Sequence, residues 1–378
     1  MSRFSRRLRR VGGAAALILA TMAASGLAIS PAHPVVAAPH AVRNIDPDGL
    51  IKNADPSVIR VGSTYVSVEV QHYRDAPDTL YVRQADSIQN LPGAAAVPIW
   101  SASGGMAHVW APEIIFDSGR YYIYFAASRD NAASHQMYIT GSNWATGGYV
   151  APYQMNIPGW AIDGVPFLFN NQRWFVWSGA ERKEVEQNLY IARMNSLDAI
   201  DQKTISLISQ PREGWERVTG GADGKPWVNE GPQPIKDPNG QLHIVYSANG
   251  SWSDQYCLGD LRLRSGGDPT NVWDWYKSNG CLFGSNPKTM MDGWHPTKKV
   301  NGPGHHSFVL LNGDINTSPP AGPAFPLMYH AVDKGIPYTW EDRHWYPGSF
   351  VWWGNTTYSR RDVPGAPSST GFGLKFFE

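Results

Sequence analysis

Short apolar runs, separated by turn residues, recur along this chain from residue 51 onward. The runs are rich in aromatic and β-branched residues, and runs of this kind bounded by Gly, Asn and Ser are typical of β-strands. The chain shows no amphipathic helix of useful length, and we expect helix only in short loop pieces such as 196–200. The predicted strand pairs are 65–68 with 80–83, 121–125 with 136–139, 174–177 with 188–192, and 243–246 with 257–261, and 326–330 opens a fifth pair whose partner is less clear.

Hairpin turns precede most of these pairs. Dipeptides that contain Gly or Asn between two apolar runs favour tight β-turns. With 38 Gly and 29 Pro in the chain, we predict an all-β fold. The turns are Gly62-Ser63, Ser118-Gly119, Asn170-Asn171 and Asn239-Gly240.

One residue stands at the start of each strand–turn–strand unit, and we call these five positions the head residues. Strands that recur in a fixed order are typical of a β-propeller, so we predict a five-bladed β-propeller in a single catalytic domain over residues 44–378. A β-sandwich is the alternative, but it does not explain a repeat with equivalent positions. The head residues are Asp55, Ala111, Asp163, Glu230 and His305.

Residues 1–38 have the pattern of a secretory signal peptide. Five Arg within the first ten residues precede a short apolar stretch at 14–29, and small residues at 36–38 suit cleavage. We therefore expect a secreted protein that has no membrane attachment once this segment is removed. Both the Sec and the Tat export routes remain open.

The charge balance narrows the class of partner. Residues 1–38 carry five Arg and no acidic residue, so the rest of the chain has a net charge of −5. This balance argues against nucleic acid as a partner and favours a neutral ligand. The two cysteines, Cys257 and Cys281, favour a disulfide in a secreted chain, with two buried free thiols as the alternative.

Three of the head residues are carboxylates, which suggests acid–base chemistry. Hydrolysis of a glycosidic bond needs one carboxylic acid to protonate the leaving oxygen and one carboxylate to activate water. A third carboxylate can keep the acid protonated, because a neighbouring negative charge raises its pKa. Asp55, Asp163 and Glu230 fit this requirement.

Several short motifs, in the right order over residues 51–331, resemble family 43 glycoside hydrolases, and their α-L-arabinofuranosidase members in particular. The resemblance implies a five-bladed propeller that inverts configuration at the anomeric carbon. It also implies that Asp55 is the general base, Asp163 the pKa modulator and Glu230 the general acid. The motifs are Asn53-Ala54-Asp55-Pro56, Trp110-Ala111-Pro112-Glu113, Ile162-Asp163-Gly164, Asn229-Glu230-Gly231-Pro232, Tyr256-Cys257-Leu258-Gly259, Gly302-Pro303-Gly304-His305 and Tyr329-His330-Ala331.

The remaining site predictions concern ligands and a cation. The indoles of Trp110 and Trp160 lie next to head residues in the chain, where they could stack on a sugar ring. The chemistry requires no cofactor, and the resemblance suggests a structural Ca²⁺ on the propeller axis, near His305. The segment after Arg343 departs from the family pattern, because Gly348 stands where Gln is expected, and the role of Arg343 is left open.

Together these features predict a secreted, monomeric, exo-acting α-L-arabinofuranosidase. Its expected substrate is a plant cell-wall polysaccharide or oligosaccharide, such as arabinan or arabinoxylan. β-Xylosidase and endo-arabinanase of the same fold remain alternatives, because loops rather than the carboxylates decide between them. A non-catalytic glycan-binding propeller is a remote alternative, since such a protein would be expected to lose a carboxylate.

Overall fold

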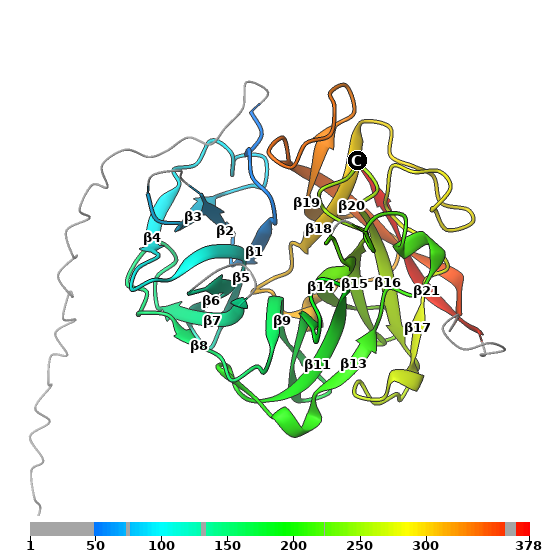
Figure 1. The fold of residues 1–378 in the computed structure, drawn as a ribbon, viewed down its shortest axis with the longest axis horizontal. Coiled ribbons are helices and arrows are strands. Elements are labelled where there is room, and N and C mark those ends of the chain that lie inside the picture. Colours follow the sequence, from blue (N-terminus) through cyan, green and yellow to red (C-terminus); the bar gives the residue numbers. More distant parts are fainter. Residues whose placement is uncertain (1–48, 73–75, 130–133, 223, 360–367) are drawn as a thin grey trace, which may run out of the picture. The chain divides into compact units, whose positions relative to one another are not determined.

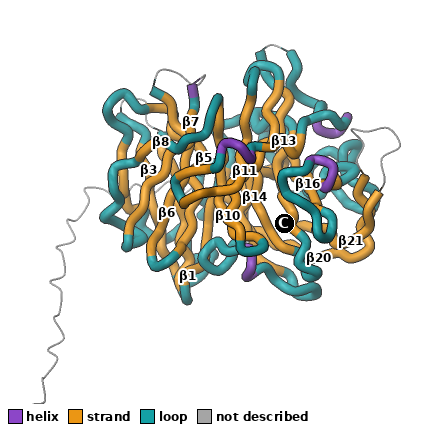
Figure 2. Tube along the Cα trace, turned by 90° about the horizontal axis from the view of Figure 1, so that it is seen from below, coloured by secondary structure: helices purple, strands orange, loops and turns teal. Residues whose placement is uncertain are grey.

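The computed structural model describes residues 49–72, 76–129, 134–222, 224–359 and 368–378, and strands dominate these ranges. Figure 2 shows few helical segments among the strands. The 3₁₀ helices are η2 (Gln202–Thr204), η3 (Gly214–Glu216), η4 (Val272–Asp274) and η5 (Ile315–Thr317). The strands are β1 (Ser57–Val61), β2 (Thr64–Gln71), β3 (Thr79–Ala85), β4 (Val97–Ser101), β5 (Ala107–Asp117), β6 (Arg120–Ser128), β7 (Gln136–Ser142), β8 (Tyr153–Gln154), β9 (Trp160–Phe169), β10 (Gln172–Ala180), β11 (Glu186–Ser196), β12 (Ala199–Ile200), β13 (Ser206–Ser209), β14 (Trp227–Lys236), β15 (Leu242–Ala248), β16 (Cys257–Leu263), β17 (Trp275–Lys277), β18 (Val300–Phe308), β19 (Phe325–Asp333), β20 (His344–Ser359) and β21 (Ser368–Phe377).

Neighbouring strands pair antiparallel in consecutive meanders, which Figure 1 shows in sequence order. Strands β1–β4 and β5–β8 form two separate four-stranded sheets. The other strands form a 13-stranded network, in which β9–β10–β11–β13, β14–β15–β16–β17 and β18–β19–β20–β21 are successive meanders. Only a short parallel pairing joins β11 to β14, and a single residue pair joins β17 to β20.

The first strands of these meanders lie against one another. Strand β1 contacts β5, β5 contacts β9, β9 contacts β14, β14 contacts β18, and β18 contacts β1. Just beyond the end of β18, the carbonyl of Leu310 accepts a hydrogen bond from the amide of Arg60 in β1, at 3.0 Å. The first strands therefore carry their head residues toward one region.

The backbone bends in the same way at each head position. Four of the five head residues, Asp55, Ala111, Asp163 and His305, have φ between 40° and 56°, a region that side chains other than Gly rarely adopt. At the remaining position the residue after Glu230 is a glycine with the same φ. The ladders of β5, β9, β14 and β18 with their partners also change register near the head, which marks a β-bulge.

These features confirm the all-β prediction and the predicted turns. The predicted second and third strands lie within β2, β3, β6, β7, β10, β11, β15, β16 and β19, and β20 supplies the third strand of the last unit. The disulfide between Cys257 and Cys281 is confirmed. The helical prediction for 196–200 is wrong: the segment turns into β12, because Ala199 pairs back onto Ser196.

The described residues belong to one compact unit that spans 38–378. Residues 1–38, with the predicted signal peptide, lie outside the described ranges. Among the described helices, none has the length and apolar character needed to cross a membrane.

Candidate active site

Four of the six predicted site residues come together at the heads of the first strands. Asp55 lies in the turn before β1, while Asp163, Glu230 and His305 lie within β9, β14 and β18. The three carboxylates and the histidine come from distant parts of the chain and act on one another electrostatically. The grouping predicted from the repeat is therefore present in the structure.

Asp55 is surrounded by positive or hydrogen-bonding groups. Its Oδ1 lies 3.2 Å from Nδ1 of His305, and its backbone amide donates to Nδ1 of His330 at 3.1 Å. Burial disfavours the charged form of Asp55, but the charges of His305 and Arg343 and the contact with His330 outweigh it and hold the pKa of Asp55 well below its usual range. Asp55 therefore stays ionised, as a general base must.

Asp163 is the most deeply buried of the three carboxylates, with 3% of its surface exposed. Its Oδ2 accepts a hydrogen bond from the amide of Gly231 at 2.9 Å. Burial raises the pKa of Asp163 to about 6, and the charge of Asp55 adds to this effect, while His305 opposes it. At neutral pH Asp163 thus carries a negative charge next to Gly231, and this charge acts on the preceding residue, Glu230.

Glu230 lies next to a hydroxyl and a negative charge, whereas Asp55 lies next to positive charges. Its Oε1 accepts a hydrogen bond from the hydroxyl of Tyr256 at 2.9 Å. Burial, followed by the charge of Asp163, raises the pKa of Glu230 to about 8. Glu230 therefore keeps its proton at neutral pH, as a general acid must.

His305 is held as a cation between carboxylates. Its Nδ1 faces Asp55, its Nε2 lies 3.8 Å from Oε1 of Glu113, and its amide donates to Oγ of Ser247 at 2.8 Å. Burial lowers the pKa of His305, but Asp55, Asp163 and Glu113 raise it to about 10. Glu113 also accepts a hydrogen bond from Nε2 of Gln233 at 2.8 Å.

A protonated histidine does not ligate a cation through its ring nitrogens, and Ca²⁺ takes roughly six to eight oxygen ligands. Across the described ranges, no group of three or more His, Cys, Asp or Glu side chains is arranged to hold a metal ion. The predicted Ca²⁺ near His305 stays a prediction, and the chemistry below uses none.

Two further residues of the site carry no role in the sequence-based prediction. His330 contacts Asp55, Tyr256 contacts Glu230, and the two rings stack on each other with centroids 5.4 Å apart and planes 13° from parallel. A side chain at Gly304 would collide with this tyrosine, since a Cβ there would lie 2.2 Å from its ring. Both residues stand in motifs already singled out, but nothing in the sequence shows which carboxylate each one contacts.

Trp110 and Trp160 both contact the ring of His135. The indole of Trp110 stacks on the ring of His135 at 3.8 Å, and Trp160 approaches the same ring edge-on at 6.4 Å. Both indoles are half-buried and pack against a core cluster beneath β5 and β9. One face of Trp110 is thus already covered, and sugar stacking by either residue stays a prediction.

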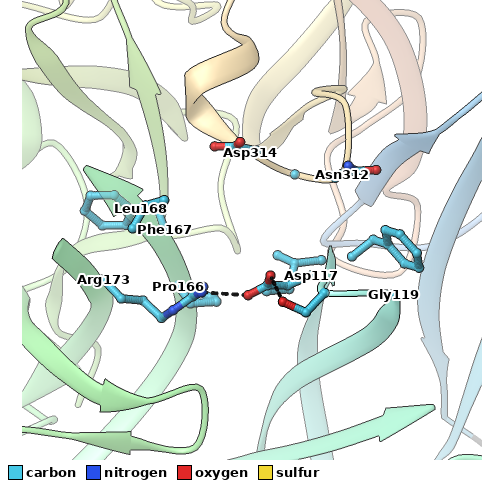
Figure 3. Close-up of a pocket in the computed structure, with 12 residues that line it drawn as sticks. Asp117, Gly119, Pro166, Phe167, Leu168, Arg173, Asn312 and Asp314 are labelled. Carbon is cyan, nitrogen blue, oxygen red and sulfur yellow. Dashed lines mark hydrogen bonds and ion pairs between the residues drawn. The ribbon is translucent and has the colours of Figure 1, made fainter. Parts of the chain in front are cut away.

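A separate cavity of about 340 Å³ lies at the other end of the first strands, around the β5–β6 and β9–β10 turns and the loop at 312–314 (Figure 3). Its polar groups are already engaged: Nη2 of Arg173 lies 2.7 Å from Oδ2 of Asp117, and Asp314 accepts from Asn316. Neither Asp55 nor Glu230 lines this cavity. This cavity is therefore not the site of the acid–base chemistry.

Comparison with known proteins identifies the family of this chain. The model of glycosyl hydrolases family 43 matches residues 50–336. An extracellular exo-alpha-(1->5)-L-arabinofuranosidase of Streptomyces avermitilis is 34% identical over 310 residues, 78% of this chain and 58% of that protein. Alpha-L-arabinofuranosidase B of Pyricularia oryzae is 30% identical over 342 residues, 86% of this chain and 63% of that protein.

Among solved structures, an α-L-arabinofuranosidase from Lactobacillus brevis superposes with a TM-score of 0.66 over 84% of this chain and 97% of that one; at 23% identity it supports the fold alone. The chain belongs to glycosyl hydrolase family 43, as the motifs predicted. It spans about three fifths of the length of the two curated relatives.

Proposed function

We propose that this protein is an inverting, exo-acting α-L-arabinofuranosidase. The observation that carries the proposal is the split between two carboxylates in one site: the pKa of Asp55 lies far below its usual range and that of Glu230 is raised to about 8. At neutral pH one is a base and the other an acid, which is the pair that glycosidic hydrolysis requires. The names of the two curated relatives support arabinofuranosides as substrates.

In the proposed reaction the proton of Glu230 passes to the glycosidic oxygen as the bond to the anomeric carbon breaks. Asp55 takes a proton from a water molecule, whose oxygen attacks the anomeric carbon from the opposite face. The products are the released sugar with inverted configuration and the shortened leaving group, and Glu230 ends ionised while Asp55 ends protonated. An inverting pair needs room for that water, so we expect carboxyl groups roughly 6.5–9.5 Å apart.

The scaffold proposed for this site is a five-bladed propeller. Five successive antiparallel meanders and the ring of contacts from β1 through β5, β9, β14 and β18 back to β1 support it. A left-handed residue at four of the five heads, and directly after the head at Glu230, gives a similar backbone bend in each unit. Residues 44–378 would then make one catalytic domain.

Exo action is proposed from the loops beside the carboxylates. The hydroxyl of Tyr338, in the β19–β20 connection, donates to the carbonyl of Ser251 at 2.8 Å, so two loops are joined. Burial and the nearby charges of Asp254, Asp55 and Glu230 raise the pKa of Tyr338, which locates this junction beside the site. Joined loops favour a pocket that admits a chain end over an open groove.

The surroundings of the enzyme are also proposed. We expect export through residues 1–38, a monomer in solution, and plant cell-wall arabinan, arabinoxylan or their oligosaccharides as substrate, without nucleic acid or membrane partners. The Streptomyces avermitilis relative, which is described as extracellular, supports export. The structural Ca²⁺ stays a prediction, and metal analysis of the purified protein checks it.

The test is hydrolysis of linear α-1,5-arabinan followed by chromatography and proton NMR of the first product. We expect arabinose as the sole early product, released first as the anomer opposite to the substrate. Early arabino-oligosaccharides would establish endo action, and a retained anomer would rule out the roles given to Asp55 and Glu230. Faster release of xylose from xylo-oligosaccharides would support the β-xylosidase alternative, and no hydrolysis of any pentoside would support a glycan-binding protein.

A further inference from the structure

A buried polar network lies behind the part of β14 that carries Glu230. At its centre is Glu216 of η3, whose side chain has no exposed surface. Its Oε1 accepts hydrogen bonds from Nδ2 of Asn229 at 3.0 Å and from the hydroxyl of Tyr246 at 2.8 Å, and both its oxygens lie 3.1 Å from Nζ of Lys277. The ammonium group balances the buried carboxylate, so the network is neutral and its centre is held from several sides.

Asn229, the residue directly before Glu230, is held by three different elements. Its Nδ2 donates to Glu216 of η3, its Oδ1 accepts from the hydroxyl of Ser209 in β13 at 2.8 Å, and its carbonyl accepts from the hydroxyl of Ser178 in β10 at 2.9 Å. Asn229 has no exposed surface, so it does not contact substrate. Its polar groups instead fix the backbone of β14 at one point.

The backbone at Asn229 needs these anchors because the ladder between β14 and β15 is interrupted directly after Glu230. The ladder between β14 and β15 pairs Glu230 with Ser247 and then skips to Gln233. Gly231, inside the gap, has a φ of 56°. A general acid must be held within about 0.5 Å of its productive position, and a bulge alone does not provide that.

We propose that Asn229, anchored by Glu216, is a positioning residue for the general acid Glu230. The anchors at Asn229 hold the strand before the bulge, and the hydrogen bond from Gly231 to Asp163 holds it after. Glu230 is thereby aimed from both sides. This inference rests on the proposed function, since it takes Glu230 to be the proton donor.

A misplaced acid has a signature that a loss of folded protein lacks. An arabinose leaving group needs a proton from Glu230, whereas 2,4-dinitrophenolate leaves without one. Loss of positioning therefore slows hydrolysis of α-1,5-arabinobiose far more than hydrolysis of 2,4-dinitrophenyl α-L-arabinofuranoside. A smaller fraction of folded enzyme slows both substrates equally.

The experiment compares kcat/KM of Asn229→Ala on these two substrates. We expect a loss of about 100-fold on arabinobiose and less than about threefold on the dinitrophenyl substrate, because a well-placed general acid contributes roughly 10²–10⁴-fold. The matched control is Tyr246→Phe, which removes another hydrogen bond to the same oxygen of Glu216 but leaves Asn229 anchored. We expect this control to change both substrates by the same small factor.

Equal losses on both substrates in Asn229→Ala, or the same leaving-group dependence in Tyr246→Phe, would overturn the proposal. Glu230→Gln separates this result from a failure of the proposed function: if it shows no leaving-group dependence, Glu230 is not the acid, whatever Asn229 does. Should Asn229→Ala not fold, Ser209→Ala removes one anchor of the same side chain. It should show the same selective loss at about tenfold, and an equal loss on both substrates would contradict the proposal.

Discussion

Asp55 and Glu230 carry the same functional group in opposite surroundings. Asp55 faces His305, His330 and the charge of Arg343, and its pKa is lowered although it is largely screened from water. Glu230 faces Asp163 and a tyrosine hydroxyl, and burial with that neighbouring charge raises its pKa. The protonation state of each carboxyl group is therefore set by the groups that surround it.

His305 and Asp163 both contribute to this difference in pKa. The cation of His305 lowers the pKa of both carboxyl groups, but it contacts Asp55 directly. Asp163 raises the pKa of Glu230, and its hydrogen bond to Gly231 keeps it next to that residue. Changing His305 should therefore affect the pKa of Asp55 most, and changing Asp163 should affect the pKa of Glu230 most.

The largest effect should come from removing either member of the pair. Asp55→Asn and Glu230→Gln each leave a side chain of the same shape, so the fold should persist while the proton acceptor or donor is lost. We expect kcat/KM on arabino-oligosaccharides to fall by about 10²–10⁴-fold in each variant. Circular dichroism and initial rates check this, with Asp314→Asn, a carboxylate of the separate cavity, as the control. A folded Asp55→Asn with near-normal activity would exclude Asp55 as the base.

Removing the cation should damage the Asp55 side. In His305→Gln the burial of Asp55 is no longer offset by that charge, so the pKa of Asp55 should rise. The base is then protonated as the pH falls through that higher pKa, and the acidic limb of the profile moves up, with an activity loss of about 100-fold near pH 5. The pH dependence of kcat/KM measures this. An acidic limb identical to that of the native protein would show that His305 does not control Asp55.

Removing the charge of Asp163 should damage the Glu230 side. Burial raises the pKa of Glu230 to about 8, and the charge of Asp163 contributes to this rise; Asp163→Asn keeps an acceptor for Gly231 but removes that charge. The acid then loses its proton at lower pH, so the basic limb moves down, with a loss of roughly tenfold above pH 8 for one pKa unit. Full activity with an unmoved basic limb would make Asp163 a structural turn residue.

The smallest effect should come from Tyr256→Phe, and its sign is opposite. The hydroxyl of Tyr256 donates to Glu230, which favours the charged carboxylate and lowers its pKa. Without it the pKa of Glu230 should rise further and the basic limb should move up, while kcat/KM at neutral pH changes by about threefold. A downward shift in this variant, in the same titration used for Asp163→Asn, would contradict the hydrogen-bond direction.

The repeat made part of this site predictable from sequence. Asp55, Asp163 and Glu230 occupy equivalent positions in separate units, and a repeating strand pattern brings equivalent positions together whatever the details of packing. The turns at Asn170-Asn171 and elsewhere were predictable for a local reason, since few residues adopt a left-handed backbone at low cost.

The partners of the carboxylates could not be predicted in the same way. His330 lies 275 residues from Asp55 in the chain, and its contact depends on how β1 meets β18 and β19. The stacking of His135 on Trp110 could not be predicted either, because His135 carries no local sequence signal. The ion pair of Glu216 with Lys277 likewise joins η3 to β17, which no motif connects.

The bulges at the heads also bear on how such a site can evolve. Because the ladder skips a pair there, a side chain can be exchanged without breaking the rungs on either side. This one chain already holds Asp, Ala, Glu and His at equivalent positions while the strands around them pair in the same manner. The head residues can thus be substituted, and the chemistry of the site altered, while the strand pairing of the sheet is kept.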